Sequence, residues 1–323
     1  MQSPKIISPT PAATATVDPE RWVEEHGDYL YRYALLRVRR PEIAEDMVQE
    51  TFFAAVRTSG SFRGKSSGRT WLCSILKNKI CDHFRKLGRE TSFTDLEFLD
   101  DELSHKFVPQ GFWNHEHGPL EWKPEAEVVM HRAEFWETLR NCLSKLPERV
   151  ADVLMLREME EMETEQICRD LNISPNNLWV MLLRARMALR ECLEMNWFKD
   201  PSTGGWMSEE YDPSPEGNPS VLARRIWLQT ALVKFIGKRT PKCREVVRTL
   251  SQSMDSKLSL RMGIKLRLHY LICVWCQRYE KQLRELRKFA SSVPDHLNDF
   301  SADTLSPTAK EWMKEALRED RRE

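Results

Sequence analysis

A short turn between two helical segments, residues 164–171 and 175–190, constrains this chain more than any other feature. Ile167 and Leu171 fall on one face of the first segment at an i, i+4 spacing. Ser174 can then cap a new helix with Pro175 at its first position, where a missing N–H carries no penalty. A capped helix after so short a turn is a helix-turn-helix, which places its second helix in the major groove. Double-stranded DNA is the first partner we expect.

Composition limits the fold and the compartment. The chain has 323 residues, enough for two or three domains, and a formal net charge of zero, so any affinity for nucleic acid must come from local patches. Glycine is scarce and alternating β patterns are absent, which predicts an all-α protein. The chain has no apolar run of about 20 residues and no hydrophobic signal core. We therefore expect a cytoplasmic protein whose eight cysteines are reduced.

Changes in composition divide the chain into seven parts. Residues 1–18, rich in Pro, Ala and Thr, and the Gly/Pro/Ser-rich residues 199–220 are expected to be flexible. The parts we expect are a disordered tail (1–18), a helical domain (19–89), an extended acidic linker (90–124), a helix-turn-helix domain (125–198), a flexible linker (199–220), a third helical unit (221–292) and a polar tail (293–323).

Residues 42–53 in the first domain form an amphipathic acidic pattern. Ile43, Met47 and either Phe52 or Phe53 point inward. The outward face is acidic or polar and includes Glu45, Asp46, Gln49 and Glu50. This face is either a docking surface or simply a solvated acidic face.

Residues 61–89 contain a basic loop followed by a basic helix. Lysines and arginines interleaved with aromatic side chains suit a surface that binds phosphates and captures unpaired bases. The candidate DNA-binding residues here are Phe62, Arg63, Lys65, Arg69, Trp71, Lys77, Lys79, Arg85 and Lys86, to which the family resemblance given below adds Asn78 and Asp82. For Trp71 and Phe84 taken individually, we favour a place in the core.

The third unit carries a metal-ligand pattern. On one helix, His269, Cys273 and Cys276 would share a face at i, i+4 and i+7, and Cys243 upstream is the simplest fourth ligand. Four N/S ligands without an open position predict a structural Zn²⁺. The alternatives are buried reduced cysteines or a redox-active pair. The cysteines at 73, 81, 142, 168 and 192 are expected in the core.

With these residues in view, the chain resembles an extracytoplasmic-function (ECF) sigma factor of bacterial RNA polymerase. Residues 44–52, 62–64 and 70–72 resemble region two of that family, followed by Asn78, Asp82 and Arg85. Residues 146–149, the helix-turn-helix and residues 184–186 resemble region four. The order and spacing of these motifs carry the resemblance.

The resemblance implies roles for these surfaces. Glu45, Asp46, Gln49 and Glu50 would dock on core RNA polymerase. The basic loop and helix would melt the minus-ten promoter element and hold the non-template strand, and the acidic linker would thread through the polymerase. The second helix of the helix-turn-helix would bind the minus-thirty-five element. No covalent chemistry is needed, so the chain is not expected to be an enzyme.

The recognition helix departs from the family pattern. Residues 177–182 are mainly apolar where the family usually has a polar run. Phosphate contacts remain for Arg184 and Arg186, whereas base-edge hydrogen bonding is left to Asn176 and Asn177. Trp179 either contacts thymine methyl groups or belongs to a docking patch for another protein surface.

The third unit resembles the zinc-binding anti-sigma domain, usually a separate protein, over residues 224–286. Tethered to the sigma regions at an effective concentration on the order of millimolar, such a module is expected to contact and restrain them. Loss of zinc or oxidation of the thiols would release it. The rival functions are a DNA-binding regulator or a zinc or thiol sensor, either acting without polymerase.

Overall fold

The computed structural model describes residues 19–59, 62, 66–90, 105–123, 126–199, 240–300 and 303–320. Within them every regular element is helical, apart from one isolated antiparallel bridge between Phe107 and Trp113. The all-α prediction is therefore confirmed. The described helices include none that is both long and apolar enough to cross a bilayer.

The first domain is a bundle of α1 (Pro19–Val38), α2 (Pro41–Arg57) and α3 (Gly68–Glu90). Pro41 begins α2 at a position where its missing N–H does no harm. Met47 and Phe52 of α2 are buried and Ile43 is half-buried, as the amphipathic pattern predicts. Phe84 of α3 is buried too, which confirms its place in the core.

The second domain contains the expected helix-turn-helix. It comprises α5 (Ala126–Val129), α6 (Ala133–Ser144), α7 (Glu148–Leu154) with a π-helical turn (Met155–Met159), α8 (Thr164–Leu171) and α9 (Pro175–Leu193). Asn172, at φ 53°, ends α8 in the left-handed conformation. The Ser174 side chain accepts a hydrogen bond from the Asn177 amide at 3.2 Å, so the predicted cap forms.

The C-terminal part contributes α11 (Cys243–Ser253), α12 (Leu260–Tyr270), α13 (Val274–His296) and α14 (Pro307–Asp320). The expected polar tail from residue 293 is wrong, because α13 continues to His296 and a further helix follows. Met313 and Leu317 of α14 are buried, so this helix packs through an apolar stripe. We refer to residues 240–320 as the C-terminal segment.

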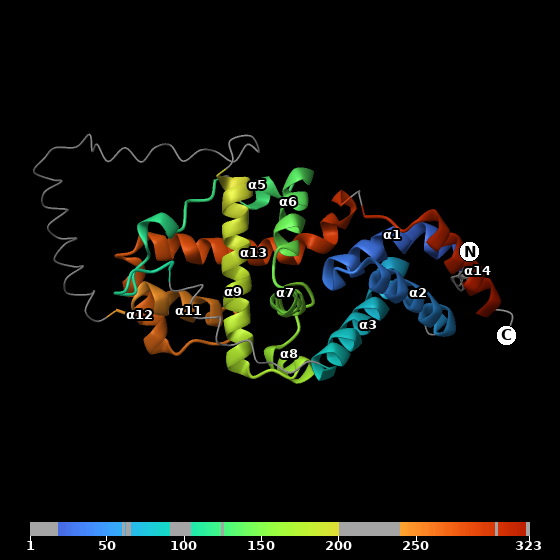
Figure 1. Ribbon diagram of the computed structural model, residues 1–323, viewed down its shortest axis with the longest axis horizontal. Helices are drawn as coiled ribbons and strands as arrows, with labels where there is room; N and C mark the ends of the chain where they lie inside the picture. Colours follow the sequence, from blue (N-terminus) through green and yellow to red (C-terminus); the bar gives the residue numbers. More distant parts are fainter. Residues whose placement is uncertain are drawn as a thin grey trace, which may run out of the picture.

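The C-terminal segment lies along both preceding domains (Figure 1). α11 and α13 pack against α9, whereas α14 packs against α1 and α2 at the other end of the molecule. The first two domains also meet directly, through α3 and α8. Helix α9 therefore lies between the first part of the C-terminal segment and its own domain.

A disulfide joins Cys142 of α6 to Cys192 near the end of α9, with their Cα atoms 5.6 Å apart. The expectation that all eight cysteines are reduced is therefore wrong for this pair. The two residues are 50 positions apart, and only the packing of α6 on α9 brings them together. Cys142 is buried, as expected for a core residue.

The second half of the acidic linker, residues 105–123, is folded and is here called the linker loop. Phe107, Trp113 and Trp122 are buried, although we expected an extended linker in this region. Trp113 packs on Tyr279 of α13, and Trp122 stacks on Phe198 with ring centroids 4.3 Å apart. Burial of these three aromatic side chains opposes an extended path.

Candidate functional site

The acidic face of α2 is positioned as the sequence predicts. Asp46 and Glu50 are exposed, while Glu45 and Gln49 are half-buried. Glu50 forms an ion pair of 2.8 Å with Lys79 of α3. Helix α14 runs beside this face, and a groove lined by Glu50 and Lys79 on one side is closed by Ala316 and Glu319 on the other.

The candidate DNA-binding residues of the first domain lie on and before α3. Arg69, Lys77, Asn78, Asp82 and Lys86 are exposed, while Phe62, Trp71, Lys79 and Arg85 are half-buried. Arg63 and Lys65 lie outside the described residues. Phe62 packs on Trp71 with centroids 4.8 Å apart, and the Arg69 guanidinium lies 4.9 Å from the centre of the Tyr29 ring.

Part of this basic face is paired with carboxylates of the second domain. Arg85 Nε lies 3.1 Å from Asp170 of α8, and Lys77 Nζ lies 3.4 Å from Glu160. The ion pairs of Lys77 and Arg85 would have to break before these side chains could pair with a phosphate instead. The arrangement therefore occupies two of the cations that the sequence assigns to DNA.

Glu160 is the centre of this contact between the two domains. It is buried and accepts hydrogen bonds from the Tyr33 hydroxyl, at 2.6 Å, and from the Arg37 guanidinium. Burial alone would raise the pKa of Glu160, but Arg37 and Tyr33 outweigh it, and the pKa lies below its usual value. Glu160 is therefore a carboxylate that fixes the first domain against the second.

Helix α9, the expected recognition helix, is almost fully covered. Within it, only Pro175, Asn176 and Ala188 are exposed. Asn177 is 8% exposed, and both Trp179 and Arg184 are half-buried. Of the residues that we expected to read bases, Asn176 alone remains open to solvent.

The Arg186 side chain is buried, so a phosphate of DNA could not reach its guanidinium. Its side chain is 3% exposed and pairs with Glu158 and with Asp255 of the C-terminal segment, the latter at 2.8 Å. It also donates to the backbone oxygen of Ser251 at 2.7 Å. In this arrangement the guanidinium is unavailable to DNA.

These contacts belong to a cluster of three arginines around two buried carboxylates, here called the arginine cluster. Asp255 forms ion pairs with Arg157 at 2.8 Å and with Arg287 at 3.0 Å, in addition to the pair with Arg186. Glu158 receives Arg186 and, at 2.9 Å, Arg287. Burial alone would raise the pKa of Glu158, but the arginines prevail and its pKa lies below the usual value.

The sequence reasoning missed Asp255 and Ser251. Both are in or beside α11 and reach α9 only through tertiary packing, because Asp255 lies 69 positions after Arg186. A lone aspartate in a polar stretch gives no pattern from which a buried partner could be predicted.

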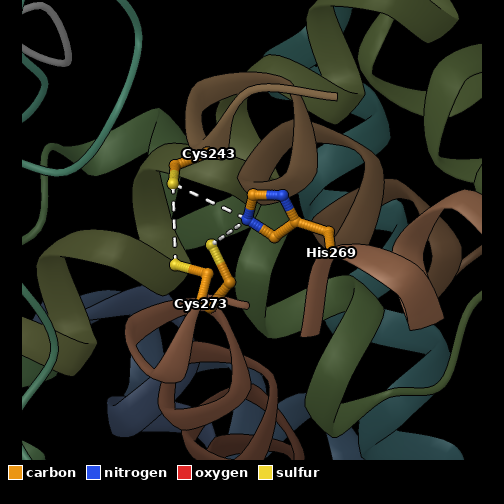
Figure 2. A group of neighbouring side chains, drawn as sticks. Cys243, His269 and Cys273 are labelled. Carbon is orange, nitrogen blue, oxygen red and sulfur yellow. Dashed lines mark hydrogen bonds between the residues drawn. The ribbon is translucent and has the colours of Figure 1, made fainter. Parts of the chain in front are cut away.

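The four candidate metal ligands do come together (Figure 2). All ligand atoms lie within 4.8 Å of one another. The Cys243 sulfur is 3.6 Å from His269 Nε2 and 3.7 Å from the Cys273 sulfur, and His269 Nε2 is 3.3 Å from the Cys276 sulfur. A tetrahedral zinc site with bonds of about 2.3 Å has edges of about 3.8 Å. These distances therefore fit a zinc ion.

The prediction that three of the ligands share one helix is wrong. His269 lies in the last turn of α12, a turn of the chain follows, and Cys273 caps α13, whose first turn contains Cys276. Close contacts with the sulfurs of Cys243 and Cys276 lower the pKa of Cys273. The contact with Cys273 in turn raises the pKa of Cys243 to about 11.

The linker loop lies directly against these ligands. The Arg244 amide, next to Cys243, donates to the Gly111 carbonyl at 3.0 Å. The Trp113 backbone amide also hydrogen-bonds to the Cys243 sulfur. Gly118 faces Trp275, and a Cβ at this glycine would lie 2.7 Å from the indole. The cluster of Cys243, His269, Cys273 and Cys276 therefore packs against the folded half of the linker.

Comparison with known proteins assigns the first two domains. A model of sigma-70 region 2 matches residues 22–90, and a model of sigma-70 region 4 matches residues 136–189. A probable RNA polymerase sigma factor of Haemophilus influenzae is 38% identical over 162 residues, which span 50% of this chain and 82% of the relative. RNA polymerase sigma factor YlaC of Bacillus subtilis is 30% identical, over 53% of this chain and 87% of the relative.

ECF RNA polymerase sigma factor SigM of Bacillus subtilis is 27% identical over 161 residues, which span 50% of this chain and 86% of the relative. The two matched regions coincide with the bundle of α1, α2 and α3 and with the helix-turn-helix domain. The chain therefore belongs to the sigma-70 family of RNA polymerase sigma factors and is of the ECF type.

Proposed function

We propose that this sigma factor is held in a closed, inactive state by its own C-terminal segment. In the open state it would bind core RNA polymerase through the α2 face and promoter DNA through α3 and α9. In the closed state the C-terminal segment would withhold these surfaces. The observation that carries the proposal is the burial of α9, a helix that must reach the major groove to read DNA.

The arginine cluster supports this proposal on the side of the second domain. A phosphate and a carboxylate compete for the same guanidinium geometry, because both accept paired N–H donors. The Asp255 side chain, which is 0% exposed, pairs with Arg186 and Arg157 as a DNA phosphate would. Removing the C-terminal segment would free both arginines from this carboxylate.

Two contacts support the proposal on the side of the first domain. The pairing of Arg85 with Asp170 occupies a cation of the candidate minus-ten surface. Helix α14 adjoins Glu50 on the candidate polymerase-binding face. Docking of the polymerase on this face would compete with α14 for the same space.

The four clustered ligands support a structural role for Zn²⁺ in the C-terminal segment. Cys243, His269, Cys273 and Cys276 would hold the ion and leave no position open for water or substrate. The ion would join α11 to the start of α13, and both of these helices pack on α9. Occupancy of the site would therefore favour the closed state.

The test is promoter-dependent transcription by core RNA polymerase with the full chain and with a chain that ends at Lys199. A second full-length variant, Asp255→Arg, adds a fourth cation to the three arginines of the cluster and forces that contact apart. Both variants should initiate at least about tenfold faster than the wild-type chain. The matched control is Asp295→Arg, since Asp295 is exposed on α13.

Equal rates for the wild-type chain, the shortened chain and Asp255→Arg would overturn the closed state while leaving the family assignment intact. A rate increase with Asp295→Arg as large as with Asp255→Arg would show that added charge, and not the arginine cluster, causes the effect.

A further inference from the structure

Helix α12 presents an apolar stripe that the described residues leave uncovered. Leu260, Ile264 and Leu268 follow one another at i, i+4 and i+8 and are 88%, 58% and 36% exposed. Leu271, directly after the helix, is 68% exposed on the same side. The opposite side carries Leu266 and the metal ligand His269, both buried. Four large aliphatic side chains in one stripe indicate a docking surface.

The charged residues in the sequence around this stripe are all basic. Residues 256–279 contain no aspartate or glutamate. The basic residues of this stretch are Lys257, Arg261, Lys265, Arg267 and Arg278. A second copy of α12 would bring like charges together, which disfavours self-association. The surface calls for an occupant that is both apolar and acidic.

Residues 91–104 of the chain have this complementary composition, and they lie outside the described residues. The acidic residues of the segment, with no lysine or arginine among them, are Asp95, Glu97, Asp100, Asp101 and Glu102. Its large apolar residues are Phe93, Leu96, Phe98, Leu99 and Leu103. Residues 200–220 are also acidic, but they are dominated by Gly, Pro and Ser and offer fewer apolar side chains.

The two ends of residues 91–104 are fixed by described contacts. On one side α3 is held to α8 by the pairing of Arg85 with Asp170. On the other side, Lys106 pairs with Glu191 of α9. Gly118 of the linker loop then lies against Trp275, five residues after the end of α12. Fourteen residues reach up to about 50 Å when extended. Figure 1 draws the linker loop and α12 at the same end of the molecule.

We infer that the exposed face of α12 is the docking surface for residues 91–104, the acidic first half of the linker between the two sigma domains. Aliphatic and aromatic side chains of the linker pack on the Leu260–Leu271 stripe, and its carboxylates pair with Arg261, Lys265 and Arg267. The linker is then retained along its whole length, its second half already being folded against the metal cluster. That consequence rests on the proposed closed state, whereas the contact itself does not.

The test replaces Ile264 in the full chain with the photocrosslinking amino acid p-benzoylphenylalanine and identifies the crosslinked peptide by mass spectrometry. The expected adduct is with residues 91–104 of the same chain. The same amino acid at Trp312, which is 55% exposed on α14, should give no such adduct. The assay contains neither polymerase nor DNA, so its failure would leave the transcription test unaffected.

Charge reversal sharpens the result. Arg261→Glu, Lys265→Glu and Arg267→Glu together should lower the adduct yield at least about fivefold at 0.1 M salt. Adding Asp100→Lys, Asp101→Lys and Glu102→Lys should restore it. The matched control is Gly263→Ala on α12, whose Cβ would meet nothing within 4 Å, and its yield should equal that of the parent.

An adduct with residues 200–220, a crosslinked dimer, or no adduct would each overturn the inference. A yield that is insensitive to the charge reversal would overturn it as well, because the proposed occupant is selected by charge.

Discussion

The C-terminal segment meets the two sigma domains through interfaces of opposite character. Its Asp255 pairs with Arg186 of the second domain inside the arginine cluster, and these side chains are 0% and 3% exposed. Against the first domain it uses α14, where Arg318 and Glu20 pair at 2.6 Å although 51% and 38% of these side chains are exposed. The first interface buries charged groups together with apolar contacts such as Phe289 on Phe135, whereas the second is an apolar stripe with solvated ion pairs beside it.

This difference predicts how the closed state opens. Removing one partner of a buried ion pair leaves an uncompensated charge, which makes such a contact all-or-none. Exposed ion pairs are weak and are screened by salt. We therefore expect α14 to detach first and reversibly, and α11 and α13 to separate from α9 only when the buried cluster or the metal site is disrupted.

The largest effect on this comparison should come from disrupting the proposed metal site. Cys276→Ser should abolish zinc binding, which contributes on the order of 10 kcal/mol in structural sites, and should unfold the contact of α11 and α13 with α9. Metal content and amide hydrogen exchange measure this, with Cys168→Ser, a half-buried cysteine of α8 outside the cluster, as the control. A chain that stays protected in α9 without metal would contradict the proposed role of zinc.

The second prediction concerns the arginine cluster. Asp255→Asn should lower the free energy of unfolding by about 3 kcal/mol, because three guanidinium groups lose a buried carboxylate. Urea denaturation measures the loss, and Asp295→Asn serves as the exposed control. A change below about 1 kcal/mol would show that the two interfaces are equally weak.

The third prediction tests the apolar part of α14. Leu317 is 2% exposed, so Leu317→Ala should destabilise the docking of α14 by about 2 kcal/mol. Hydrogen exchange should accelerate in α14 and remain unchanged in α9, since the two interfaces lie at opposite ends of the C-terminal segment. Equal acceleration in both helices would mean that the two interfaces open together.

The fourth prediction uses the direct contact between the two sigma domains. Burial raises the pKa of Asp152 in α7 to about 7, although Arg39 of the first domain, 3.3 Å away, opposes this. The folded chain then binds an extra proton between about pH 4 and 7, so its free energy of unfolding falls as the pH rises through this range. Between pH 5 and 7 we expect a loss of about 2 kcal/mol from this group.

Urea denaturation across this range measures the loss, and Asp152→Asn should remove the slope that this residue contributes. An unchanged slope in the variant would assign the pH dependence to other groups.

The smallest effect should come from salt. Raising the ionic strength from about 0.1 to 0.5 M shortens the screening length and weakens the pairs of Arg318 with Glu20 and of Lys310 with Asp28. Hydrogen exchange in α14 should accelerate modestly, while exchange in α9 stays constant. Faster exchange in α9 alone would show that the interface with α9, and not the one with α14, is the salt-sensitive one.

Sequence reasoning predicted the features that depend on local order. The cap at Ser174 and the inward face of α2 follow from residues within one or two helical turns of each other, and both are confirmed. The four metal ligands were also selected correctly as neighbours, because cysteine and histidine spacing carries a strong chemical signal. The break between α12 and α13 was missed, because an i, i+4, i+7 spacing is also satisfied by two helices that meet at a turn.

Features that depend on long-range packing could not be predicted. Arg186 was assigned to DNA by its place in a motif, but two of its partners, Ser251 and Asp255, lie 65 and 69 positions later in the chain. The disulfide of Cys142 with Cys192 and the docking of α14 depend on packing between helices distant in sequence. The described half of the linker carries buried aromatics, and in the sequence these looked merely scattered.

The covering segment lies at the end of the chain, and this order has a consequence during protein synthesis. The two sigma domains are complete by residue 199, whereas the helices that cover them begin at residue 243 and end at residue 320. At about 5–20 residues per second, a ribosome needs roughly 6–25 seconds to add the remaining part of the chain. If the closed state exists as proposed, every newly made molecule passes through an interval in which α9 is complete and the C-terminal segment that covers it is not.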